Sequence, residues 1–165
     1  MTLVREFHVA VEQPYADHPI VPPADDVKRR IRLVKEEFAE VMEELTALLV
    51  AVNKGARLPA VLEIHVRLLK ELADLRYVIE GTAVEFGLPI DEAFSEVHRS
   101  NMTKRFRDGT FHKEPGGKVL KGEDYEQADM AKFVPQPTDV DFVFEGGARL
   151  GNLNFSAGPG VTFVA

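Results

Sequence analysis

Four stretches of the chain place apolar residues three and four positions apart, which is the spacing of one face of an α-helix. They cover residues 2–13, 25–53, 58–86 and 89–105. Beyond residue 106 this spacing is lost, and glycine and proline turn signals become frequent. The pattern therefore predicts an all-α protein with a core that resembles a four-helix bundle.

Local signals support these boundaries. Pro14 is expected to end the first helix, and Asp25 or Asp26 to cap the start of the second. Gly55 suits the left-handed position that follows the second helix, and Gly87 is expected to stop the third.

The 165 residues are enough for one domain with a core of its own. We expect an all-α domain over residues 1–134 and an irregular, glycine-rich extension over residues 135–165. Short apolar runs in the extension are compatible with short strands or with a flexible arm.

The composition excludes several classes of site. With no cysteine, the chain has no disulfide, thiolate nucleophile or zinc-thiolate centre. The net charge of −7 argues against a nucleic-acid partner. No basic-apolar leader and no apolar run of membrane-spanning length is seen, so we expect a cytoplasmic protein with no membrane partner.

Two acidic clusters interrupt the apolar faces of the second and third predicted helices. Glu37 and Glu40 project onto the apolar arc of one helix, and Glu71 and Asp74 onto that of the next. Carboxylates that face each other in a low-dielectric interior repel and are costly to desolvate. A divalent cation would compensate for both effects. Because the donors are all oxygens, the pattern predicts a hard ion, Mg²⁺ with Mn²⁺ as a substitute.

Three further residues extend this hypothesis to phosphate chemistry, because a cation bound by carboxylates suits triphosphate hydrolysis. Glu36 projects to the edge of the cluster and is a candidate general base or ligand of a further ion. Asn101 and Lys104 share an apolar face of the fourth helix and are candidates for binding phosphate oxygens. An acidic run is more often a solvated helix face, and Asn101 and Lys104 also suit a helix C-terminus. The presence of all these clusters in one chain favours a metal and phosphate site over solvated helix faces.

The acidic pattern resembles that of the all-α nucleoside triphosphate pyrophosphohydrolases, the MazG-like group that includes phosphoribosyl-ATP pyrophosphohydrolase and the dimeric dUTPases. Their pattern Glu-Glu-x-x-Glu, then Glu-x-x-Asp, reads here Glu36, Glu37, Glu40, Glu71 and Asp74. The segments 4–8, 96–104 and 117–122 resemble a MazG-like branch found in bacteria and phages, so the likeness covers roughly residues 3–130. The thirty residues between Glu40 and Glu71 predict long helices.

The resemblance implies hydrolysis of a (deoxy)nucleoside triphosphate between the α- and β-phosphates, giving a monophosphate and pyrophosphate, as in sanitation of the nucleotide pool. It implies Mg²⁺ or Mn²⁺ held by the helical core, for which Glu37, Glu40, Glu71 and Asp74 are the expected ligands. It also implies a homodimer or homotetramer with the active site completed near a subunit interface.

Three other interpretations stay open from the sequence. Phosphoribosyl-ATP hydrolysis uses the same chemistry on a different nucleotide. A di-iron carboxylate bundle needs Glu-x-x-His on two helices, which this chain lacks. A non-catalytic helical module would use the acidic faces to bind a basic partner. The preferred base and sugar are not encoded in the spacing.

Overall fold

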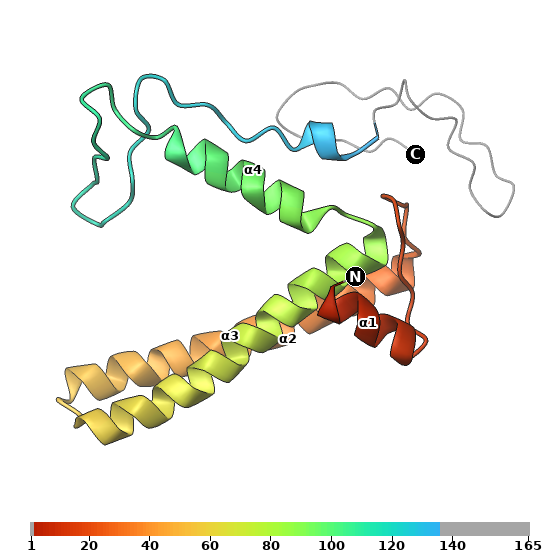
Figure 1. The fold of residues 1–165 in the computed structure, drawn as a ribbon. Coiled ribbons are helices and arrows are strands. Elements are labelled where there is room, and N and C mark those ends of the chain that lie inside the picture. The colour runs from red at the N-terminus through yellow and green to blue at the C-terminus, as the bar shows by residue number, and fades with distance from the viewer. Residues whose placement is uncertain (1, 136–165) are drawn as a thin grey trace, which may run out of the picture. The chain divides into compact units, whose positions relative to one another are not determined.

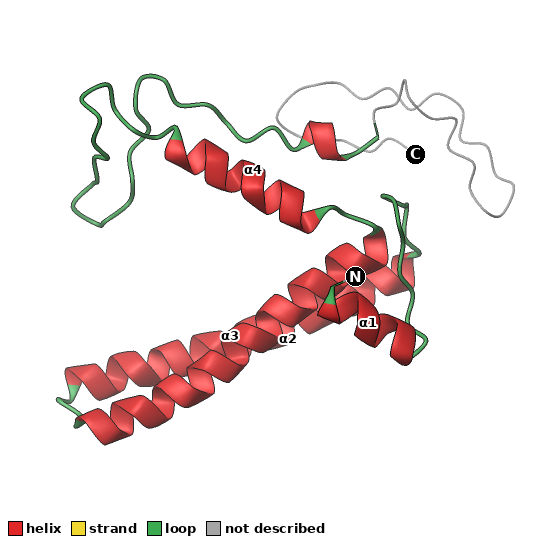
Figure 2. Ribbon diagram, viewed as in Figure 1, coloured by secondary structure: helices red, strands yellow, loops and turns green. Residues whose placement is uncertain are grey.

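The computed structural model describes residues 2–135, which form helices and loops. In chain order the elements are α1 Leu3–Ala10, α2 Ala24–Asn53, α3 Leu58–Phe86, α4 Ile90–Met102 and the 3₁₀ turn η1 Ala131–Phe133 (Figures 1 and 2). Within the described residues, strand pairing is limited to an isolated bridge between Lys113 and Val119. The predicted all-α class is confirmed. The proposed strands of the glycine-rich extension lie outside the described residues.

The chain divides into two compact units, residues 1–91 and the residues from 92 onward. The first unit holds α1, α2 and α3, and the second holds nearly all of α4 with the loops that follow it. No helix in the described part of the chain is long and apolar enough to cross a membrane.

The first unit is built on a long antiparallel hairpin of α2 and α3, coloured orange to yellow-green in Figure 1. The helices contain 30 and 29 residues, as the long spacer between the acidic clusters predicted. Gly55 (φ 67°) turns the chain between them, and Gly87 (φ 68°) ends α3 in the left-handed conformation. Both glycine assignments from the sequence are confirmed.

A buried polar network ties α1 and α2 to the far end of α3. Glu85 is 2% exposed and forms ion pairs with Arg29 and Arg30. His8 on α1 donates from Nδ1 to the Pro14 carbonyl oxygen at 2.8 Å, and its Nε2 accepts from Arg30 at 3.2 Å. Each buried charge therefore has a partner, as burial in a low-dielectric environment requires. The network fixes where α1 lies against the hairpin.

In the second unit the loop after α4 folds back on the helix. The Glu96 carboxylate accepts hydrogen bonds from Arg99, Lys132 and the Asp129 backbone N–H, and the pKa of Glu96 is lowered by these donors, Arg99 first. Ser100 donates to the Glu126 carbonyl oxygen at 2.7 Å. The loop is therefore an ordered part of this unit, held by side chains of α4.

Three predictions about helix ends were wrong. Helix α1 ends at Ala10 rather than at residue 13. Helix α2 begins at Ala24 with Pro23 as its N-cap, so Asp25 and Asp26 lie in the first turn instead of capping it. Helix α4 ends at Met102 rather than near residue 105, because the Lys104 carbonyl oxygen accepts a hydrogen bond from Gly122 of the returning loop.

The buried face of α4 also differs from the prediction. The sequence pattern placed Asn101 on the apolar, inward face together with Val97, but both are exposed. Glu96 and Ser100 are the buried residues of this helix. The returning loop covers the polar face because Glu96 and Ser100 bind its backbone and side chains. The periodicity of hydrophobic residues cannot predict polar contacts of this kind between a helix and a distant loop.

Candidate metal centre

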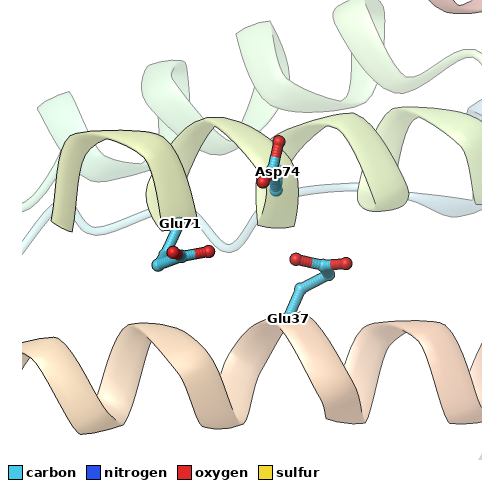
Figure 3. Close-up of side chains that lie close together, drawn as sticks. All are labelled: Glu37, Glu71 and Asp74. Carbon is cyan, nitrogen blue, oxygen red and sulfur yellow. The ribbon is translucent and has the colours of Figure 1, made fainter. Parts of the chain in front are cut away.

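Three carboxylates converge between α2 and α3. Glu37 of α2 and Glu71 and Asp74 of α3 each offer an oxygen atom, and these atoms lie within 4.8 Å of one another. Figure 3 shows Glu37 and Glu71 pointing from facing helices into the space between them, with Asp74 one turn further along α3. Two helices therefore supply one set of three oxygen donors, and Glu40, the fourth ligand expected from the sequence, is not among them.

The cluster is one step in a regular antiparallel register. Acids that are about one turn apart on α2 face residues that are about one turn apart on α3, in the opposite chain direction. Glu44 accepts a hydrogen bond from Arg67 at 2.8 Å, Glu40 shares a hydrogen bond with Glu71, and Glu37 lies beside Asp74. The hairpin thus determines which acids meet.

The surroundings of the cluster raise the pKa values of two acids on α2, Glu37 and Glu40. The pKa of Glu37 is raised, first by desolvation and then by the negative charge of Asp74. The pKa of Glu40 is raised, first by its hydrogen bond with Glu71 and then by desolvation and nearby charge. Glu37 and Glu40 are therefore protonated more readily than an ordinary glutamate, an effect that a bound dication would oppose.

The acids lie on a partly open face of the hairpin, not in a closed interior. Side-chain exposure is 13% for Glu71 and 42% for Asp74, and Glu37 and Glu40 are half-buried. The acids are therefore less buried than their position on the apolar helix faces predicted, because the two helices alone cover only one side of them. This opening gives a ligand direct access to the carboxylates.

Glu36 lies outside the three-residue cluster. Its side chain is exposed on α2, and its charge is one of the smaller factors that raise the pKa of Glu37. It is therefore near enough to act on the cluster and open enough to reach a water molecule. Among residues 2–135 no hydrogen bond or ion pair holds the Glu36 carboxylate, and its role as a base or as a ligand stays a prediction.

Lys70 lies next to the cluster and was missed by sequence reasoning, whereas Glu44 shares the acidic arc of α2 in the sequence. The Lys70 ammonium lies 3.0 Å from Glu71 and 2.9 Å from Asp74. Glu44 follows the acidic run of α2, and its Oε2 is buried with no hydrogen-bond partner among the described residues. The i, i+4 spacing of Lys70 and Asp74 in the sequence could have indicated that Lys70 lies beside this acid.

Asn101 and Lys104 belong to the second unit. Lys104 follows the end of α4, and its ammonium donates to the Asn101 side-chain oxygen at 2.7 Å. Asn101 keeps its amide N–H groups for another acceptor. The two predicted phosphate ligands thus lie together, and their role stays a prediction.

The donor set at the three-carboxylate cluster fits a hard divalent cation. All three groups are carboxylates. The sequence has no cysteine and the cluster contains no histidine, so the ligands that favour softer metals are missing from it. Three acids with a single adjacent lysine also leave net negative charge, which a dication would neutralise. The residues present therefore suit Mg²⁺ or Mn²⁺.

Comparison with known proteins identifies the family of the chain. A family model described as phosphoribosyl-ATP pyrophosphohydrolase matches residues 4–101, more than half of the chain. The match includes all five acids of the motif and ends at Asn101. No curated protein shows significant similarity to the sequence. The resemblance inferred from the acidic pattern is confirmed: the chain belongs to the phosphoribosyl-ATP pyrophosphohydrolase family of all-α pyrophosphohydrolases.

Proposed function

We propose that the protein is a Mg²⁺-dependent nucleoside triphosphate pyrophosphohydrolase. It would cleave a (deoxy)nucleoside triphosphate between the α- and β-phosphates and release a monophosphate and pyrophosphate. The observation that carries this proposal is the convergence of Glu37, Glu71 and Asp74 from two helices within 4.8 Å. A cluster of this kind repels a bare polyphosphate, so substrate binding requires a cation between them.

Each acid has a distinct part in this proposal. Glu37, Glu71 and Asp74 hold the cation, and Glu40 joins them or orients Glu71 through their hydrogen bond. When bound, the cation supplies charge neutralisation at the phosphate oxygens and a lowered pKa for coordinated water. Glu36 accepts the proton of the attacking water from its exposed position.

In this proposal Asn101 and Lys104 bind phosphate oxygens of the substrate. The amide N–H groups of Asn101 and the ammonium of Lys104 are donors held side by side by their mutual hydrogen bond. An amide and a point charge together suit the spread negative charge of a phosphate group.

We further propose that the enzyme is a homodimer or homotetramer. Only four apolar residues of the described chain are buried, all in the first unit: Val4, Val41, Ile64 and Ala83. Large apolar side chains are instead exposed along both helices of the hairpin, among them Phe38, Leu49, Val66 and Leu69. A second copy of the chain is the partner proposed here, because two hairpins would bury equivalent apolar faces against each other.

The family match favours a second candidate, hydrolysis of phosphoribosyl-ATP. This reaction cleaves the same bond of a triphosphate whose base carries an additional ribosyl phosphate. The carboxylate cluster serves both substrates equally, because it addresses the phosphate chain and not the base.

An assay of products separates these candidates. The protein is incubated with each common nucleoside and deoxynucleoside triphosphate and with phosphoribosyl-ATP, with and without Mg²⁺, and pyrophosphate and orthophosphate are measured separately. We expect Mg²⁺-dependent pyrophosphate release from a nucleoside triphosphate. Turnover of phosphoribosyl-ATP alone selects the second candidate. Release of orthophosphate only, or turnover in the presence of excess chelator, contradicts both.

A matched pair of variants links the activity to the cluster. Glu71→Gln removes one charge from the cluster and is expected to abolish turnover while helical circular dichroism is unchanged. Glu63→Gln removes an exposed charge two turns earlier on α3 and is expected to leave turnover as in the wild type.

A further inference from the structure

The loop after α4 docks on the end of that helix through paired hydrogen bonds. Thr103 accepts from the Glu126 backbone N–H at 2.9 Å, and Ser100 donates to the Glu126 carbonyl oxygen at 2.7 Å. The Gly122 backbone N–H donates to the Lys104 carbonyl oxygen at 3.2 Å. Residues 121–126 are therefore fixed beside Asn101 and Lys104.

Gly122 makes this close approach possible. A Cβ atom at this position would lie 2.4 Å from the Arg105 carbonyl oxygen and 3.1 Å from that of Lys104. Both neighbours are backbone atoms, which cannot turn aside as a flexible side chain does. Only glycine is accommodated here, and the backbone of its neighbour Lys121 is therefore also held close to residues 104 and 105.

Ser100 and Lys121 both contact the Tyr125 side chain. Ser100 Oγ lies 3.5 Å from it, and the Lys121 ammonium lies 4.3 Å from the centre of the tyrosine ring. The pKa of Tyr125 is lowered, first by its hydrogen bond with Ser100 and then by the positive charges of Lys121 and Lys104. Both lysines are therefore close enough to act on one hydroxyl group.

These two lysines differ from three other cations of the unit, which are paired with carboxylates. Arg99 and Lys132 are neutralised by Glu96, and Arg107 by Asp124. Within residues 2–135, Lys104 and Lys121 form no ion pair with a carboxylate, although Glu123 and Glu126 flank Tyr125 in the sequence. Two positive charges and a polarised hydroxyl group are thus available to an anion.

We propose that Lys104, Lys121 and Tyr125, with the amide of Asn101, form a phosphate-binding site of the second unit. Its ligand is the pyrophosphate group, present both in the nucleotide tail and in the released product. Two ammonium groups and a phenol supply separate donors, which match the several oxygens of a diphosphate better than those of a single carboxylate. The choice of pyrophosphate rests on the proposed function, whereas the cluster itself does not depend on it.

Metal-free binding tests the site. Pyrophosphate is titrated into the full-length protein in the presence of a chelator, and binding is followed by phosphorus NMR. We expect Lys121→Gln to weaken binding about tenfold or more, because charge-assisted hydrogen bonds are lost. Lys121→Arg keeps the charge and is expected to bind within about threefold of the wild type. Lys118→Gln removes an exposed charge of the same loop as a control and is expected to bind like the wild type.

A second titration with a nucleoside triphosphate, also without metal, asks whether the site takes the substrate tail. An equal effect of Lys121→Gln on both ligands supports binding of the nucleotide tail, and an effect on pyrophosphate alone supports a product site. The inference is overturned if the wild type binds neither ligand, or if Lys121→Gln and Lys118→Gln bind alike. Backbone amide exchange of residues 121–126 verifies that Lys121→Gln keeps the loop docked.

Failure of this inference and failure of the proposed function give different results. If only the inference fails, Mg²⁺-dependent pyrophosphate release is retained by Lys121→Gln with an unchanged KM. If only the proposed function fails, no nucleotide yields pyrophosphate, yet Lys121→Gln still weakens pyrophosphate binding relative to Lys118→Gln.

Discussion

The Lys70 ammonium lies 2.9 Å from a carboxylate oxygen of Asp74. It also lies 3.0 Å from Glu71, so one lysine bridges both acids that α3 gives to the candidate metal centre. Its pKa is raised by the hydrogen bond to Asp74 first and by that to Glu71 second. Lys70 thus supplies positive charge at the place where we propose a divalent cation.

Replacement of Lys70 is predicted to strengthen metal binding. Lys70→Gln removes a charge that competes with the cation, so the affinity for Mn²⁺ should rise roughly two- to fivefold, as suits an exposed ion pair. Calorimetric titration of Mn²⁺ measures this directly. Arg76→Gln, which breaks the exposed ion pair with Glu80 one turn further along α3, serves as the control and should bind Mn²⁺ like the wild type. Weaker Mn²⁺ binding by Lys70→Gln than by Arg76→Gln would contradict the competition.

The raised pKa values of Glu37 and Glu40 predict how pH acts on the metal-free protein. The folded state retains protons just above the ordinary glutamate pKa of 4.5, whereas the unfolded state has released them. The folded state therefore binds more protons in this window, and this contribution to stability falls as the pH rises through it. The stabilisation by Mg²⁺ changes in the opposite direction, because the cation binds the deprotonated acids.

Thermal unfolding from pH 4.5 upward, with and without Mg²⁺, measures both trends. We expect the difference between the two melting temperatures to widen as the pH rises. A Glu37→Gln variant should show a smaller pH dependence of the metal-free melting temperature. A difference between the two conditions that is constant over this range would argue against coupling of the cation to these acids.

Two helix-ending glycines form a matched pair for a stability prediction. Both have a left-handed φ, but a Cβ at Gly87 would lie 1.9 Å from the His18 carbonyl oxygen, whereas nothing lies within 4 Å of one at Gly55. Gly55→Ala should cost about 1–2 kcal/mol for the left-handed backbone alone. Gly87→Ala should cost clearly more, because the segment containing His18 must move. Urea unfolding compares the two, and equal costs would show that this segment does not pack against Gly87.

Helical periodicity was sufficient for the hairpin and its acidic pairs. Glu37, Glu71 and Asp74 could be placed together because each pair spans one turn and the spacer predicts two long antiparallel helices. The degree of burial could not be predicted in the same way. The burial of the acids depends on what covers the open side of the hairpin, and helical periodicity in one sequence does not predict which segment covers it.

The second unit was harder to anticipate because side chains and a loop determine it. Ser100 and Glu96 look like solvated residues in the sequence, yet they are buried by hydrogen bonds to residues about 30 positions away. Gly122 gives a turn signal, but its close approach to the Arg105 carbonyl oxygen becomes visible only in the structure. Contacts of this range leave no periodic pattern.

The most direct test of the central claim is the thermal stability of the protein with Mg²⁺ or Mn²⁺. An ion that binds only the folded carboxylate cluster must stabilise it, by about 2.7 kcal/mol at one hundred times its dissociation constant. We predict a melting temperature several degrees higher for the wild type and for Glu63→Gln, and no increase for Glu71→Gln. An equal increase in all three proteins, or none in the wild type, would contradict a metal centre formed by Glu37, Glu71 and Asp74.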